Sequence, residues 1–178
     1  RYNTDTSRVF YYSYAQEKNT SAQEFINTIS STLDSFKSTA ENFVAYLQVV
    51  IPIAENDADY KLAKNKIDSL KNYFNVYMNS LAEGISKLSK LNEFDTSLKM
   101  VTPCLYFFKK TKDAYSSTFP SWFKIYKVGW DKARDSDKQI MITSSKTLRE
   151  ANLSSWKELK NMGIIIDEFN SKYALNSK

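Results

Sequence analysis

One stretch of the chain, residues 20–51, carries apolar side chains at helical spacing without a break. The steps between them alternate between three and four residues, which is the pattern of a helix that packs lengthwise against another helix. The apolar positions are Ile26, Ile29, Leu33, Phe36, Ala40, Phe43, Leu47 and Val50. At about 1.5 Å per residue, such a helix is a rod of about 45 Å. A rod of this length buries its apolar stripe only against other rods, so the stretch predicts a bundle of long helices.

Residues 57–91 repeat the three-four spacing and predict a second long helix. Its stripe consists of Tyr60, Ala63, Ile67, Leu70, Phe74, Tyr77, Leu81, Gly84, Leu88 and Leu91. A short segment with Pro52 separates the two stretches, and proline disfavours helical backbone just before it, so we expect an antiparallel hairpin. Gly84 lies in the stripe although glycine costs about 1 kcal/mol of helix propensity relative to alanine. We therefore expect a bulky side chain of a neighbouring helix to cross there.

The remainder of the chain predicts further helices and a short N-terminal arm. Because Pro120 should break the pattern, the expected later helices are residues 97–118, 121–142 and 145–174. Residues 1–18 contain several aromatic side chains, and we expect a short helix or an extended arm laid on the bundle.

Glycine and proline are scarce, with 3 residues of each among 178. Folds with many tight turns need both residue types, so their scarcity favours few turns and long helices. No linker, repeat or low-complexity tract interrupts the chain, and residues 1–178 are expected to form a single domain. The predicted fold is all-α: an antiparallel up-and-down bundle of four or five helices, three of them long.

The composition argues against most catalytic and metal chemistry. The chain has no histidine, which removes the usual general base at neutral pH and the usual zinc and haem ligand. Cys104 is the one cysteine, so neither an internal disulfide nor a cysteine cluster for a metal can form. The paired carboxylates, such as Asp57 with Asp59, lack the spacing of a calcium loop. We therefore expect no catalytic residues, no metal and no cofactor: the chain is not an enzyme.

A basic and aromatic segment is the sharpest functional signal. In residues 98–128, six lysines are opposed by one acid, Asp113, although the net charge of the whole chain is only +5. Exposed aromatic rings beside lysines suit an acidic protein partner, because the rings supply buried area and the amines steer the encounter. The expected partner-binding residues are Phe107, Lys109, Lys110, Lys112, Trp122, Phe123, Lys124 and Lys127.

The sequence thus predicts a non-enzymatic, soluble helical-bundle protein that presents this surface to a protein partner. The alternatives are a carrier of lipid or another apolar ligand between the helices, or a protein that binds an anionic membrane surface. Nucleic acid is the weakest alternative because arginine is scarce in the segment and no binding motif for RNA or DNA is present. The tyrosine-rich polar composition and the absence of an initiator methionine favour a secreted or cell-surface location.

Overall fold

The computed structural model describes residues 6–54 and 60–175 of the chain, which form four helices and, in this part, no strand. They are α1 (Thr6–Ala54), α2 (Tyr60–Leu88), α3 (Val101–Val128) and α4 (Asp135–Lys172). The prediction of an all-α fold with four or five helices is confirmed. All four helices are long, however, where three long helices were expected.

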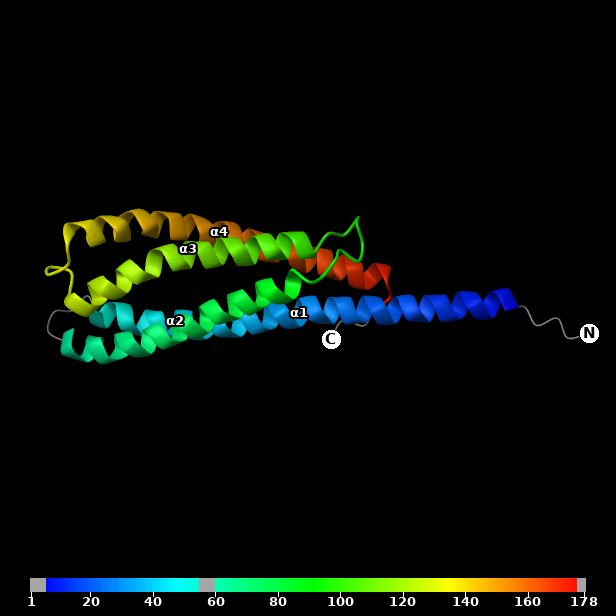
Figure 1. Cartoon of the computed structure of the whole chain (residues 1–178), viewed down its shortest axis with the longest axis horizontal. Helices are drawn as coiled ribbons and strands as arrows, with labels where there is room; N and C mark the ends of the chain where they lie inside the picture. Colours follow the sequence, from blue (N-terminus) through cyan, green and yellow to red (C-terminus); the bar gives the residue numbers. More distant parts are fainter. Residues whose placement is uncertain (1–5, 55–59, 176–178) are drawn as a thin grey trace, which may run out of the picture.

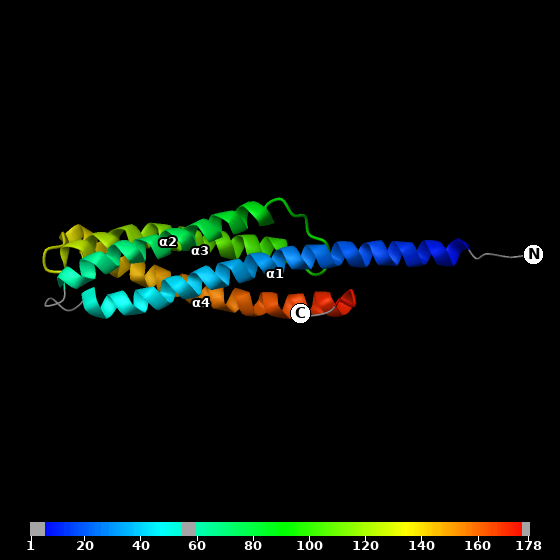
Figure 2. The same cartoon turned by 90° about the horizontal axis from the view of Figure 1, so that it is seen from below.

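The helices lie alongside one another and form an elongated molecule (Figure 1). Helix α2 packs against α1 and α3, and α3 packs against α4. The first turns of α1 extend beyond the other three helices, as Figure 2 shows from a second side. The arm expected at residues 1–18 is therefore wrong for residues 6–18, which continue α1, and residues 1–5 lie outside the described part. Since residues 6–19 contain no glycine or proline, nothing stops the helix from starting this early.

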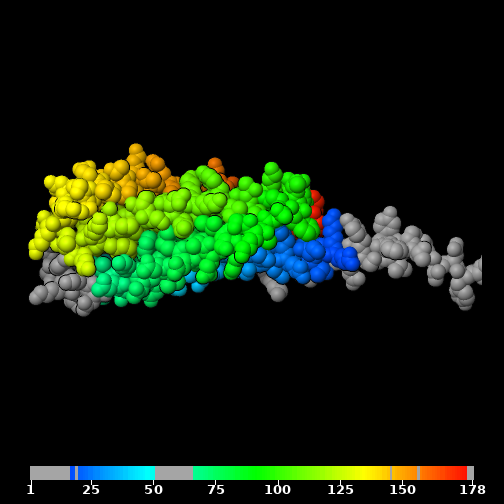
Figure 3. Space-filling view, in the orientation of Figure 1, coloured from blue at the N-terminus to red at the C-terminus, as the bar shows by residue number. Residues whose placement is uncertain are grey.

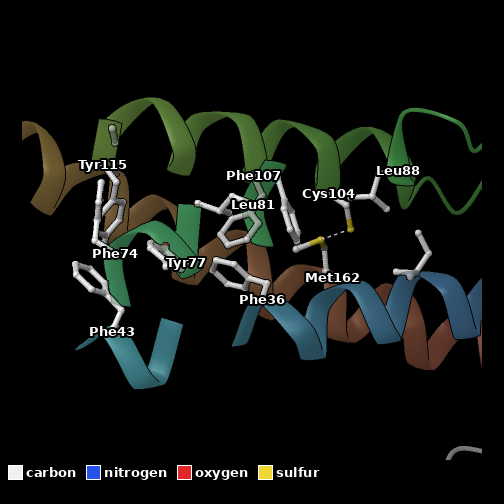
Figure 4. Close-up of a cluster of buried hydrophobic side chains, with 14 of the residues drawn as sticks. Phe36, Phe43, Phe74, Tyr77, Leu81, Leu88, Cys104, Phe107, Tyr115 and Met162 are labelled. Carbon is white, nitrogen blue, oxygen red and sulfur yellow. Dashed lines mark hydrogen bonds between the residues drawn. The ribbon is translucent and has the colours of Figure 1, made fainter. Parts of the chain in front are cut away.

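Aromatic rings from α1, α2 and α3 form the centre of the core (Figure 4). We call the following residues the aromatic core: Phe36, Phe43, Phe74, Tyr77, Phe107, Phe108, Tyr115 and Phe119. Neighbouring ring centroids in it lie between 5.1 and 6.1 Å apart. At these separations tilted and edge-on pairs contribute about 0.5–1.5 kcal/mol beyond the area that they bury. The rings thus fix how closely the first three helices approach.

Gly84 shows why the second stripe contains a glycine. The ring of Phe108 on α3 lies directly against it, and a Cβ atom at this position would overlap that ring. The crossing of a bulky side chain at Gly84 is confirmed. The close contact between α2 and α3 therefore depends on the absence of a side chain at this one position.

The later helix boundaries differ from the prediction because Pro120 does not end a helix. Helix α3 runs through it to Val128, so the expected helices 97–118 and 121–142 are wrong. Pro120 lies on the exposed side of α3, where water can hydrogen-bond the carbonyl that lacks a partner, while the fully buried Phe119 anchors the turn. The helix ends instead at Gly129, whose φ of 84° and ψ of 151° belong to a region that only glycine occupies readily. Helix α4 then begins at Asp135 and continues through residues 142–145.

Glu93 caps the start of α3 from the preceding loop. Its carboxylate accepts hydrogen bonds from the backbone N–H groups of Met100, Val101 and Thr102, at 2.8, 3.0 and 2.8 Å. The next residue is Pro103, which has no N–H group. The first turn of α3 therefore leaves none of these backbone donors without an acceptor. Burial raises the pKa of Glu93, but the hydrogen bonds from Thr102, Met100 and Val101 outweigh it and hold the pKa below its usual value.

Asp95 ties the same loop to the end of α4. Its carboxylate accepts hydrogen bonds from the backbone N–H and hydroxyl of Ser97, from the Lys172 amine and from the Tyr173 hydroxyl. The Lys172 amine, followed by the Ser97 donors, holds the pKa of Asp95 well below its usual range. Glu93 and Asp95, two residues apart in the loop between α2 and α3, thus attach it to the start of α3 and to the end of α4 through carboxylates that must be ionised.

Gly84→Ala and Gly163→Ala form a matched pair for testing the helix crossing. Alanine adds about 1 kcal/mol of helix propensity at either site. At Gly163, where nothing lies within 4 Å of the added atom, we expect a gain of up to about 1 kcal/mol in the free energy of unfolding. At Gly84 the overlap with Phe108 should cost about 1–3 kcal/mol and reverse the sign. Urea unfolding of both variants measures the difference, and a Gly84→Ala protein more stable than the wild type would contradict this packing.

Acid should weaken the fold through Glu93 and Asp95. Both carboxyl groups have lowered pKa values in the folded chain, so their stabilisation is complete above the unfolded-state value of about 4 and is lost as the pH falls through the folded-state values. We expect the melting temperature to drop as the pH is lowered from about 5 to about 2. The Glu93→Gln/Asp95→Asn variant should melt lower at pH 7 but show a flatter pH profile. Glu83→Gln on the exposed side of α2 is the control, and parallel profiles for all three proteins would disprove this role.

Candidate functional site

All eight predicted partner-binding residues lie on one continuous helix, α3, rather than on two. Residues 107 and 127 are separated by five to six turns, or about 30 Å. Figure 3 shows α3 exposed between α4 and α2 on this side of the molecule. The helix faces its neighbours with one side and solvent with the other, and the eight residues are divided between these sides.

Phe107 is part of the core and not of the surface. Its side chain is 2% exposed, and its ring meets the Phe36 ring edge-on with the centroids 5.2 Å apart. The prediction of Phe107 as a partner contact is therefore wrong. The buried positions of α3 extend from Val101 and Phe119 on one flank to Ala114 and Ser121 on the other, so its neighbours cover a wider arc than one stripe.

Trp122 and Phe123 are half-buried and pack against the core. The Trp122 ring lies 4.9 Å from the Phe119 ring, and the Phe123 ring lies 5.5 Å from the Phe74 ring. Phe123 was expected to point outward, and its contact with α2 corrects that expectation. The indole N–H of Trp122 is buried and has no hydrogen-bond acceptor within the described part of the chain. These two rings chiefly hold α3 in place.

The predicted lysines behave in two ways. Lys109, Lys124 and Lys127 are exposed, and none of them forms an ion pair with another described residue. Lys110 and Lys112 are half-buried. The Lys110 amine donates a hydrogen bond of 3.0 Å to the Ser154 hydroxyl and lies 5.5 Å from the centre of the Tyr106 ring. Lys110 therefore links α3 to α4, and the exposed cations are the other three.

Three exposed apolar residues accompany these cations and were not among the predicted contacts. Tyr106 is 56% exposed, Val128 42% and Trp130 47%. Trp130 follows the end of α3, and the Lys138 amine lies 5.7 Å from its ring. The three exposed lysines and these three residues together are called the α3 basic face: Tyr106, Lys109, Lys124, Lys127, Val128 and Trp130. A depression lined by Tyr106, Lys109, Asp113 and Glu150 adjoins it, with a volume of about 710 Å³.

The buried thiol and phenol groups whose pKa values are raised lie in the packed core. Burial, and then the nearby Glu93 carboxylate, raise the pKa of the Cys104 thiol to about 12, and the thiol donates to the Met162 sulfur at 2.8 Å. Burial also raises the pKa of the Tyr77 and Tyr115 hydroxyls. A thiol or phenol held neutral in this way is a poor nucleophile or base.

Within the described part of the chain, no group of three or more cysteine, aspartate or glutamate side chains is placed to hold a metal ion. No described helix has the length and apolar character needed to cross a lipid bilayer.

The chain was compared with models of protein families, with curated proteins and with solved structures, and none of these comparisons finds a match.

Proposed function

We propose that this chain is a non-enzymatic helical-bundle protein that binds an acidic protein partner through the α3 basic face. The observation that carries the proposal is the exposure of Lys109, Lys124 and Lys127, which make no ion pair among the described residues. On the same side of α3, the exposed Tyr106 lies three residues before Lys109 and the exposed Val128 four residues after Lys124, and the exposed Trp130 follows the end of the helix. Unpaired cations lose little on meeting an acidic partner, because no internal ion pair has to be broken first.

The exposed apolar side chains give such a partner something to bury. Aromatic residues dominate the energy of protein interfaces, while charges at the rim mainly steer the encounter. The exposed Tyr106 ring and the Trp130 ring, which lies 5.7 Å from the Lys138 amine, both offer apolar area to a partner. The absence of enzymatic activity is supported by the buried positions of the shifted Cys104, Tyr77 and Tyr115 groups.

We also infer that the four helices follow the antiparallel up-and-down order predicted from the sequence, in one domain. Contacts between α1 and α2 support this order, since Phe36 meets Tyr77 while the later Phe43 meets the earlier Phe74. Between α3 and α4, Cys104 meets Met162 while the later Tyr115 meets the earlier Asn152. A bundle of this kind presents the α3 basic face on a stiff rod. The secreted or cell-surface location stays a prediction.

Charge reversal tests the proposed surface. The Lys109→Glu/Lys124→Glu/Lys127→Glu protein should capture its partner from an extract of its native source at least ten times less than the wild type, and the wild-type capture should weaken as salt increases. The control is Lys71→Glu/Lys87→Glu/Lys90→Glu, which makes the same change in net charge at exposed lysines on and just after α2. Quantitative mass spectrometry of the captured proteins measures the effect.

The outcomes separate the classes of partner. Equal loss in both triple variants would mean that net charge alone matters, and the α3 basic face would be rejected. Binding of the wild type to phosphatidylserine vesicles, lost in the same variant, would point to a membrane surface instead. Binding to duplex DNA with a steep salt dependence would point to nucleic acid.

A further inference from the structure

A groove opens between α1, α3 and α4, on the side of α3 that faces away from the α3 basic face. Helices α1 and α4 meet near the end of α4, where the Phe25 and Phe169 ring centroids are 5.7 Å apart. Figure 1 shows the two helices separating from there toward the other end of the molecule. The space between them has a volume of about 710 Å³.

The walls of the groove are mainly apolar. They include Leu33, Phe36, Ala40 and Val44 from α1, Phe107 from α3 and Leu159 from α4. Val44 is 39% exposed, and Leu33 and Ala40 are half-buried, although all three lie on the side of α1 that a fully closed bundle would cover. An apolar concave surface of this kind is typical of a ligand site.

Polar groups on the floor of the groove already have partners. The Thr111 and Ser155 hydroxyls lie 3.3 Å apart, and the Tyr115 hydroxyl donates to the Asn152 side-chain oxygen at 3.2 Å. A ligand chain that covers these bonded groups does not have to replace their hydrogen bonds. Covering them with a hydrocarbon chain therefore costs less than covering hydroxyls without partners.

The size of the groove suits a small ligand. The lining on α1 extends from Leu33 to Gln48, which is about 22 Å along the helix axis. A volume of about 710 Å³ lies within the range of small-molecule sites, about 300–1,000 Å³.

Charged side chains on the α1 edge of the groove indicate the head group. Asp34, Lys37 and Glu41 all line it, so two carboxylates flank one amine. The Lys37 amine is 3.9 Å from the Glu41 carboxylate, and these side chains are 73% and 67% exposed. This loose pair can exchange partners at little cost. Two acids and one base at one edge complement a head group with both a negative and a positive charge, and they disfavour a fatty acid, whose carboxylate adds a third negative charge.

We propose that the groove between α1, α3 and α4 binds a zwitterionic single-chain lipid, a lysophospholipid with one acyl tail, a phosphate and a quaternary ammonium group. The tail lies along Leu33, Phe36, Ala40 and Val44, the phosphate faces Lys37, and the ammonium group faces Asp34 or Glu41. This inference does not depend on the proposed protein partner. Phe107 and Thr111 line the groove on the inner side of α3, while Lys109 and Lys124 lie on its exposed side, so either proposal can fail alone.

Titration calorimetry with lysophosphatidylcholines of 10 to 16 tail carbons, each below its micelle concentration, tests the site. We expect one lipid per chain and an affinity that rises about fourfold with each added methylene until the tail fills the groove, after which it levels off. Dodecanoate should bind at least five times more weakly than the lysophosphatidylcholine with the same tail. The proposal is overturned if no tail length binds, if affinity rises without levelling, or if dodecanoate binds equally well.

Matched variants locate the site. Ala40→Phe fills the groove and should weaken binding at least tenfold, while Ala82→Phe, on an exposed position of α2, should leave it unchanged. If Ala40→Phe melts below the wild type, Val44→Trp at the exposed edge replaces it in the same test. Lys37→Gln should weaken lysophosphatidylcholine at least threefold, whereas Asp34→Asn/Glu41→Gln should remove most of the discrimination against dodecanoate. Equal affinity for the Ala40→Phe and Ala82→Phe proteins would place the lipid elsewhere and reject the groove.

Discussion

The packing of large aromatic rings between α1, α2 and α3 determines the rest of the structure. Phe43 and Phe119 are fully buried and contact each other across the bundle with their centroids 5.1 Å apart. Rings of this size keep helices apart except where a residue without a side chain lets them approach, as Gly84 does under Phe108. Because the rings belong to three helices, these three form the tightly packed part, and α4 is joined to it mainly through α3.

The described side chains of α4 differ between its middle and its end. In the middle, the Asn152 and Ser155 side chains each form a hydrogen bond with α3. At the end, the Phe169 and Tyr173 rings meet the Phe94 ring, and Phe169 also meets Phe25 of α1. Among the described side chains, these rings hold α4 close to α1 at this end of the groove.

The sequence predicted the buried stripes of α1 and α2 well because one strict period governs each, although α1 begins earlier than predicted, at Thr6, and runs through Pro52 to Ala54. Ile29, Phe43, Leu70 and Leu81 of those stripes are fully buried. The same reasoning failed on α3, since that helix has neighbours over a wider arc, and a single stripe does not reveal Phe107 as a second buried row. The effect of proline on the end of the helix was also predicted wrongly. Pro120 is tolerated on the exposed side of α3, and the helix ends at Gly129, which has a positive φ. Glu93 reaches backbone groups seven to nine residues away, and no local capping pattern encodes such a contact.

The α3 basic face and the edge of the groove on the opposite side of α3 carry different charges, and each suits a different one of the two proposed ligands. The outer side carries Lys109, Lys124 and Lys127, which form no ion pair among the described residues and outnumber the one acid of this helix, Asp113, and so it favours anions. The groove edge on α1 has Asp34 and Glu41 against the single Lys37, and so it does not. An acidic partner steered by the outer lysines gains nothing from approaching the groove, since charges farther apart than about 8–10 Å are screened at physiological salt. The two proposed ligands therefore approach opposite sides of α3, about 10 Å apart, and over this distance, close to the screening length at physiological salt, a charge on one side acts only weakly through solvent on the other.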